Sequence, residues 1–353
     1  MRQQVVGLKI GASQLAAARV SVNGAVEVLQ VARGPLAPGL VAGGEVRDVP
    51  GLAAELKSFF KTHKLPGRAV RIGIANNRIG VRTIELSGIS NAKQLSNAVR
   101  FRAQEALPIP IDDAVLDFQV LSEGRDHAGA PTQRVLLVVA YRDLVDGYAR
   151  ACKQAGLRLV GVDLEAFALL RALSPATAPV PGVERSALVA VAIGSERSTL
   201  AVSDGFTCEF TRVLDWGGRT LTASIATALS LELDEAERVK KLLSLEGGPV
   251  VEGLTDQQTE AAREAVRQGL QGFGRELVSS LQFYQSQPDS LGIREVVLAG
   301  GTAQLMGLAT ELHRLVGVTV RVGDPLLAAS LGKKVREVEG PSLAIPIGLG
   351  MAA

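Results

Sequence analysis

Two stretches of this chain repeat one pattern of strands and turns. Residues 5–31 and residues 187–213 each predict a strand, a Gly-containing turn, a second strand, a hairpin and a third strand. "LKIGAS" in the first copy matches "VAIGSE" in the second, and the Asn-Gly hairpin of the first matches an Asp-Gly hairpin in the second. An internal repeat indicates duplicated units, and ligands bind preferentially where two such units meet. We therefore expect an α/β fold with two similar lobes around a cleft.

Composition limits what such a fold can do. Of the 353 residues, 47% are hydrophobic, which is enough for a large core, and the formal charge is only +2. Without a basic tract, nucleic acid is not an expected partner. The two cysteines, Cys152 and Cys208, give no disulfide framework and indicate a reducing compartment. No secretory signal or membrane-length apolar run is recognisable, so we expect a cytoplasmic protein.

Three Gly-containing turns are candidate phosphate sites. Backbone N–H groups in such turns can converge on an anion, and glycine allows close approach. The third turn also predicts the start of a helix, whose N-terminus attracts negative charge. A structural role is the alternative for each turn taken alone, but their matching positions in the repeat favour a shared ligand site. The turns are Gly11-Ala12-Ser13, Gly194-Ser195-Glu196 and Gly300-Gly301-Thr302.

The middle of the chain has a different pattern of predicted helices and strands. A helix predicted from Ser90 ends at the prolines of "LPIPIDD", and two strands and a second helix to about Ala155 follow. This pattern predicts a small α+β insert. The expected organisation is a first lobe in two parts (1–86 and 157–186), an insert (87–156), a second lobe (187–335, with a helical subdomain at about 232–290) and a segment that returns to the first lobe (336–353).

The layout resembles the actin-like superfamily, whose fold is ribonuclease H-like and which includes sugar kinases and bacterial actin homologues. In that superfamily the first two turns hold phosphates and the Gly-Gly-Thr turn contacts adenosine, so the resemblance implies ATP as a cofactor. The segment "AERVK" (236–240) is similar to a helix that touches ribose or adenine. Glu237 and Lys240 are its candidate ligands, because residues three apart share a helix face, and a surface ion pair is the alternative.

Within the superfamily, the chain resembles the PilM family of type IV pilus assembly proteins. The segment "NAVRFRAQEALPIPIDDAVLDFQVL" (97–121) carries the family's helix ending in Glu-x-x-x-Pro-Φ-Pro-Φ-Asp, followed by a strand. The matching residues are Glu105, Pro108, Pro110, Asp112 or Asp113, and Asp117. The resemblance covers residues 5–352 and implies a duplicated actin-like fold with a small α+β insert like that of FtsA and PilM.

The PilM resemblance implies a scaffold rather than an enzyme. In that family the insert and adjoining lobe hold the N-terminal peptide of a membrane partner, PilN, within a PilN/PilO-type inner-membrane complex that serves the pilus motor ATPase. The chain would then lie at the inner membrane through its partner, in a pilus system or a related secretion or competence system. Alternatives are an active actin-fold ATPase or small-molecule kinase, and an FtsA-like filament-forming division protein. The candidate partner wall is the predicted helix face with Val99, Arg100, Phe101, Ala103 and Leu107.

Two departures from the superfamily pattern concern its metal chemistry. The superfamily places an acid before each Ile-Gly turn, where it orients Mg²⁺-bound water. This chain has Lys9 at the first position and Ala192 at the second, with Glu196 as a partial substitute. Lys9 could pair with a phosphate or block the site with a salt bridge. We therefore expect neither a bound Mg²⁺ nor efficient ATP hydrolysis.

Overall fold

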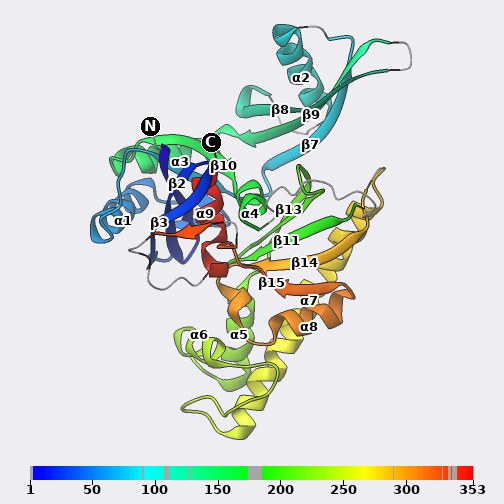
Figure 1. Ribbon diagram of the computed structural model, residues 1–353. Helices are drawn as coiled ribbons and strands as arrows, with labels where there is room; N and C mark the ends of the chain where they lie inside the picture. The colour runs from blue at the N-terminus through cyan, green and yellow to red at the C-terminus, as the bar shows by residue number, and fades with distance from the viewer. Residues whose placement is uncertain are drawn as a thin grey trace.

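The computed structural model describes residues 3–89, 91–106, 111–126, 129–173, 185–288, 290–327, 329–332, 335 and 340–352. Figure 1 shows two lobes side by side and a third, smaller unit that projects above them. The predicted linker at 174–184, which joins the lobes, lies outside the described residues.

The first lobe is built on a six-stranded sheet. Its first three strands form an antiparallel meander. On the other side of the first strand, the strand at 70–74 pairs with it in parallel, and the strand at 159–164 pairs in parallel with that one. A short two-stranded hairpin, β4 (Val41–Ala42) with β5 (Glu45–Val46), follows the meander. In spatial order the strands are β10 (Leu159–Leu164), β6 (Val70–Ile74), β1 (Gln3–Ile10), β2 (Gln14–Asn23), β3 (Ala25–Pro35) and β16 (Ser330–Leu331).

The second lobe repeats this sheet strand for strand. An antiparallel meander is again extended in parallel from its first strand, so five strands of each lobe share one order and one set of directions. This common topology confirms the predicted duplication. In spatial order the strands are β13 (Cys208–Leu214), β12 (Ser198–Ser203), β11 (Ala187–Ile193), β14 (Ile293–Ala299) and β15 (Thr319–Val322).

Helices cover the sheets. On one face of the first sheet, α1 (Val49–Thr62) and α3 (Arg142–Gln154) pack over an apolar core. On its other face, α4 (Glu165–Leu173) and α9 (Ala344–Met351) pack together and also reach the second sheet, so they form the joint between the lobes. The second lobe carries α5 (Gly218–Leu229), α6 (Leu233–Leu242), α7 (Asp256–Gln285) and α8 (Leu308–Val316).

The insert is a three-stranded antiparallel sheet with one helix. Its order is β7 (Ile79–Ser87), β9 (Pro131–Tyr141), β8 (Ala114–Arg125), and α2 (Ala92–Ala106) covers one face. We expected residues 79–86 in the first lobe and the helix at 143–155 in the insert. Instead, β7 pairs with β9 and belongs to the insert, whereas α3 packs on α1 in the first lobe. Strand pairing and helix packing join residues far apart in sequence, which local patterns do not specify.

Both cysteines are buried, and burial raises the pKa of each thiol to about 12. Because the thiolate is the reactive form, we expect neither thiol to react with a disulfide reagent at neutral pH while the protein is folded. Both should react after unfolding in denaturant, which absorbance of the released reagent anion would measure. Fast labelling of one thiol in the native protein would contradict this arrangement.

Candidate functional site

The second Gly-containing turn is docked on the start of α5. The Gly194 N–H donates to the Arg197 carbonyl at 2.9 Å and closes the turn. The N–H groups of Gly218 and Arg219, at the start of α5, donate to the carbonyls of Gly194 and Ser195, each at 2.8 Å. A Cβ on Gly217 would lie 2.4 Å from the Ser195 carbonyl oxygen, so only glycine fits this contact. The contact between the "WGG" segment before α5 and the second turn was not predicted, because no local pattern marks it.

The third turn packs directly against the second. Gly300 has φ +89°, and a Cβ there would lie 2.3 Å from the Ile193 carbonyl oxygen. A Cβ on Gly218 would lie 2.2 Å from the Thr302 Oγ1. The predicted helix start at this turn was wrong: Gly301–Gln304 form one 3₁₀ turn, and α8 begins only at Leu308 after Gly307 with φ +83°. The helix N-terminus at this site therefore belongs to α5.

The first turn joins the same region from the other lobe. Its Gly11 N–H donates to the Gln14 carbonyl at 3.0 Å, as expected for a tight hairpin. The 3₁₀ turn Gly340–Leu343 connects the lobes below it: Arg33 Nη1 donates to Ser342 Oγ at 2.7 Å, and the Gly300 N–H donates to the Pro341 carbonyl at 2.8 Å. The second and third turns are therefore in direct contact, and the 3₁₀ turn connects the third turn to β3 of the first lobe.

Lys9 lies at the end of β1 and forms an ion pair whose partner was not predicted from the sequence. Its Nζ is 3.2 Å from Oε2 of Glu165, the first residue of α4. The side chains are 19% and 9% exposed, respectively, so the pair is largely shielded from water. The salt bridge that we had considered for Lys9 is therefore present, with Glu165 as its partner.

Glu237 and Lys240 do share one face of α6, as predicted, but they are not a surface pair. Lys240 is 7% exposed, and its Nζ donates to the Gly218 carbonyl at 3.0 Å, Thr222 Oγ1 at 2.9 Å and Glu237 Oε2 at 2.6 Å. Burial lowers the pKa of Lys240, and the hydrogen bonds from Lys240 and Thr222 lower the pKa of Glu237 despite its own desolvation. All three ammonium protons are used: two of these hydrogen bonds join α6 to α5, and the third goes to Glu237 on α6 itself.

Glu196 and Arg197 connect the second turn to the first lobe. Glu196 Oε2 accepts from the Gly43 N–H at 3.4 Å and lies near Arg219, at 3.6 Å between Oε1 and Nη1. Arg197 pairs with Asp215 at 2.8 Å. The turn between β4 and β5 therefore lies against the second Gly-containing turn, and Glu196 is engaged in these contacts.

The described residues do not fit a divalent metal. They contain no group of three His, Cys, Asp or Glu side chains placed to hold an ion. Ala192 is 2% exposed and packs with α4 and α9 in the core at the lobe joint, and Glu165 is neutralised by Lys9. Mg²⁺ at a nucleotide takes most of its oxygen ligands from phosphates and water and one or two from carboxylates, and neither Lys9 nor Ala192 can supply a carboxylate.

The predicted partner wall on α2 is only partly accessible. Val99 and Ala103 are buried in the insert core against its sheet. Arg100 is exposed and Phe101 is 61% exposed, whereas Leu107 lies outside the described residues. A partner that binds this helix would therefore meet Arg100 and Phe101, and not the two buried residues.

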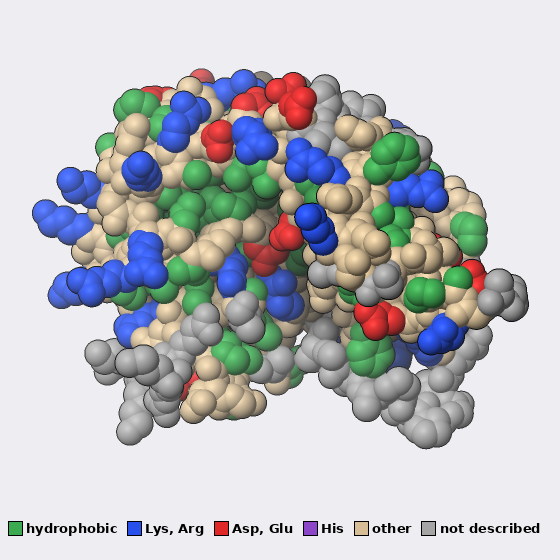
Figure 2. All heavy atoms as spheres, turned by 90° about the horizontal axis from the view of Figure 1, so that it is seen from above, with side chains coloured by type: hydrophobic (Ala, Val, Ile, Leu, Met, Phe, Trp, Pro, Cys, Tyr) green, Lys and Arg blue, Asp and Glu red, His purple; other side chains and the backbone are tan. Residues whose placement is uncertain are grey.

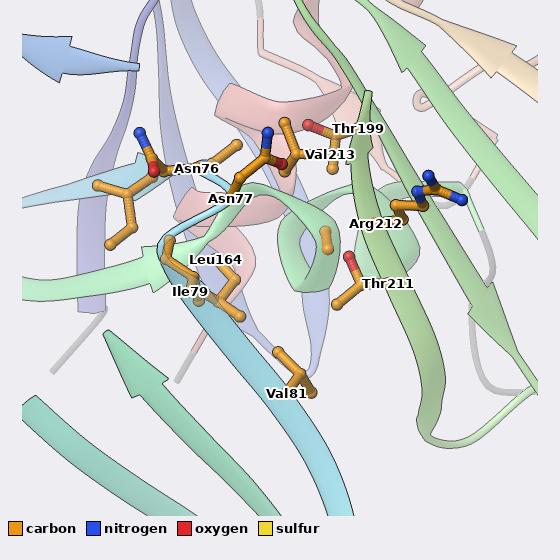
Figure 3. A pocket seen from close by; sticks show the side chains of 12 residues that line it. Asn76, Asn77, Ile79, Val81, Leu164, Thr199, Thr211, Arg212 and Val213 are labelled. Atoms are coloured by element: carbon orange, nitrogen blue, oxygen red, sulfur yellow. The ribbon is translucent and has the colours of Figure 1, made fainter. Parts of the chain in front are cut away.

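A cavity of about 180 Å³ lies where the insert leaves the first lobe (Figure 3). One wall is β7, the facing wall is β13 of the second lobe, and the ends of β6 and β10 close the bottom. Its lining is mainly aliphatic, with amide and hydroxyl groups among it. Arg212 extends away from it towards Ser280 on α7 (Figure 3). The other lining residues are Ile74, Ala75, Asn76, Asn77, Ile79, Val81, Leu164, Ala166, Thr199, Thr211 and Val213.

Comparison with known proteins decides the family. The family model described as "Type IV pilus assembly protein PilM" matches residues 7–353. The chain belongs to the PilM family. A solved PilM–PilN type IV pilus biogenesis complex contains a chain that is 28% identical, with a TM-score of 0.80 and coverage of 99% of this chain and 98% of that one.

Other relatives place this PilM-family protein in the actin-like superfamily. The cell division protein FtsA of Escherichia coli is 26% identical over 95% of this chain and 87% of its own length. The MreB5 structure of Spiroplasma citri, bound to ADP, is 12% identical and shares the fold with a TM-score of 0.56, over 98% of this chain and 94% of its own. The predicted actin-like fold is thereby confirmed. No helix within the described residues is long and apolar enough to span a bilayer.

Proposed function

We propose that this PilM-family protein is a scaffold of the inner-membrane pilus assembly complex and docks the N-terminal cytoplasmic peptide of a PilN-like membrane protein. It would reach the inner membrane through this partner, and PilO-type proteins and the motor ATPase would follow as neighbours in the assembly. Family membership supports the pilus role, and the PilM–PilN complex of a relative supports the partner. A related secretion or competence machine would use the same contact.

The observation that carries the docking proposal is the cavity between two strand edges. Within the described residues, β7 is an outer strand of the insert sheet and β13 an outer strand of the second lobe's sheet. On their outer sides, the backbone N–H and C=O groups of β7 and β13 therefore have no neighbouring strand to pair with. An extended peptide can pair with such an edge and place alternate side chains in pockets beside it.

The residues that line the cavity determine which side chains a bound peptide can place there. Ile79 and Val81 on β7 and Val213 on β13 give an apolar interior that suits aliphatic side chains. Asn77, whose Nδ2 donates to Asp215 Oδ2 at 2.9 Å, lies at the rim where the lobes meet. Figure 2 shows a hollow in the middle of this end of the molecule, with acidic and basic side chains around it. An extended segment with aliphatic anchors fits this surface best.

The test is a titration with a fluorescently labelled peptide of the PilN-like partner, followed by anisotropy. Val81→Asp and Val213→Lys place a charge on opposite walls, and we expect each to weaken binding at least about tenfold, because burying an unpaired charge is costly. Both variants should keep the wild-type circular dichroism spectrum. The lone Trp216 is a poor reporter of this event, because it stacks on Phe273 in the second lobe, with 4.1 Å between ring centroids.

Phe101→Ala on the exposed face of α2 is the matched control. We expect it to leave the dissociation constant within about twofold, since surface changes away from an interface have small effects. If Phe101→Ala abolished binding while the wall variants retained it, α2 would be the docking face and the cavity would not. No binding by folded wild-type protein at high micromolar peptide would refute the adaptor function.

We further propose that the cleft between the lobes holds ATP without efficient turnover. Three turns and the start of α5 gather there, and glycines at 217, 218 and 300 keep the backbones in close contact. Hydrolysis is not supported because neither Lys9 nor Ala192 can orient a metal-bound water. Steady Mg²⁺-ATP turnover that Gly301→Val abolished would favour an ATPase or kinase instead.

A further inference from the structure

Lys9 is a charged group at the nucleotide cleft with unused hydrogen-bonding capacity. It directly precedes the first turn and, among the described residues, its Nζ has one charged partner, Glu165, at 3.2 Å. An ammonium group carries three protons. Lys240 uses all three on protein acceptors within 3.0 Å, but Lys9 does not. Lys240 is therefore a structural cation, whereas Lys9 can still donate to a ligand.

Glu165 keeps Lys9 in place. Its carboxylate lies at the start of α4, where the helix dipole favours negative charge, and it is 7% exposed. The ion pair with this buried carboxylate restrains the rotamers of the Lys9 side chain. The Lys9 side chain is nevertheless 19% exposed, so a ligand can approach it.

The backbone around Lys9 favours an anion. Within the described part of the chain, no protein acceptor is recorded for the N–H groups of Ala12 and Ser13 in the first turn, or for those of Ser195 and Glu196 in the second. Unbonded N–H groups in Gly-containing turns form anion-binding concavities. Lys9 adds a full positive charge beside the first of them.

We propose, building on the nucleotide-binding part of the proposed function, that this cleft takes the polyphosphate of a nucleoside triphosphate without a divalent cation, with the Lys9 ammonium as its counter-charge. Among the described residues, no group of three His, Cys, Asp or Glu side chains could hold an ion at this place, and Ala192 is buried at the lobe joint. A lysine acts on a phosphate as a point charge and needs no metal bridge. The phosphate oxygens accept hydrogen bonds from the Lys9 ammonium protons that do not bond to Glu165.

This assignment predicts the opposite of the usual dependence of ATP affinity on Mg²⁺. Mg²⁺ lowers the negative charge of ATP, and the carboxylate beside Lys9, that of Glu165, is already paired with the ammonium. Metal-free ATP should therefore bind at least as tightly in excess EDTA as ATP does in excess MgCl₂. Trp216 suits this measurement, because it precedes Gly217 and Gly218, which contact the second and third turns.

The experiment is a titration of the full chain with ATP by calorimetry and Trp216 fluorescence, in excess EDTA and in excess MgCl₂. We expect Lys9→Met to weaken binding of metal-free ATP by about tenfold to a hundredfold, as for loss of a hydrogen bond to a charged group. Glu165→Gln should tighten it a few-fold, because Lys9 then has no competing anion. Lys57→Met, on the exposed face of α1, makes the same charge change away from the cleft and should have no effect.

Three results would overturn the inference. The first is ATP binding only in the presence of Mg²⁺, and the second is unchanged affinity in Lys9→Met. The third is no ATP binding by wild-type protein under either condition, which would also remove the nucleotide from the proposed function. The scaffold role would remain open to its own test in the peptide titration, so the two failures can be told apart.

Discussion

Replacing Gly348 by alanine is expected to lower the free energy of unfolding by about 3 kcal/mol or more. Gly348 lies in α9, the helix that joins the two lobes, and a Cβ there would lie 1.8 Å from the Ala168 carbonyl oxygen and 2.5 Å from the Ala168 carbonyl carbon. Both atoms are backbone, so no side-chain rotation can relieve the clash and the helices must separate. Denaturant unfolding, followed by circular dichroism, measures the difference.

Gly272→Ala is the control for this prediction. Gly272 lies within α7, and nothing lies within 4 Å of a Cβ built there. Alanine is the better helix former, so this substitution should leave stability unchanged or raise it by up to about 1 kcal/mol. A Gly348→Ala protein as stable as wild type would show that α4 and α9 do not approach each other this closely.

Lys240→Met is expected to destabilise the protein by about 2–3 kcal/mol. The change removes the ammonium that donates to the Gly218 carbonyl and the Glu237 carboxylate. Thr222 Oγ1 is then the remaining side-chain donor for both, and buried polar groups that lose a charged partner are costly. The side chain of Glu237 is 36% exposed, so water screens part of the loss and the estimate is below that for a fully buried pair. Lys241→Met, one residue on and 71% exposed, should cost less than about 0.5 kcal/mol.

The pH dependence of Lys240→Met provides a second readout. In the native protein, the pKa of Glu237 lies below its ordinary value of 4.5. Its ionised form therefore stabilises the fold above pH 4.5, and this stabilisation is lost as the pH falls through the lower native pKa. Lys240→Met should weaken this acid-side dependence. If the variant kept wild-type stability and lost only ATP affinity, Lys240 would be a ligand and not a structural cation.

Local sequence accounts for the parts of the fold that depend on neighbouring residues. Asp48 accepts a hydrogen bond from the Gly51 N–H at 3.0 Å and caps α1, with Pro50 in the first turn. Thr255 and Gln258 form a reciprocal capping box at the start of α7. The Asn-Gly and Asp-Gly hairpins lie where the repeat placed them, and Gly24 and Gly205 both have positive φ.

The residues that contact the candidate site residues could not be predicted in the same way. Lys9 and Glu165 are separated by most of the first lobe and the whole insert, and nothing in the local sequence around Glu165 marks it as a partner. The same holds for Glu196 and Gly43, which meet only because the lobes close against each other. The predicted helix after Gly301 was wrong because Gly307 adopts positive φ and interrupts the helical conformation before α8 begins.

The sequence by itself determined that a strand–turn–strand pattern is duplicated, that Gly-containing turns end three strands, and that a lysine and an alanine stand just before two of these turns. These properties are local: they follow from residue identity, spacing and turn conformation. Only the tertiary structure decided that β7 belongs to the insert, that Lys240 is saturated while Lys9 is not, and that β7 and β13 enclose a cavity. Each of these depends on which distant surfaces pack together, because burial and hydrogen-bond satisfaction are properties of the assembled core and not of any one segment.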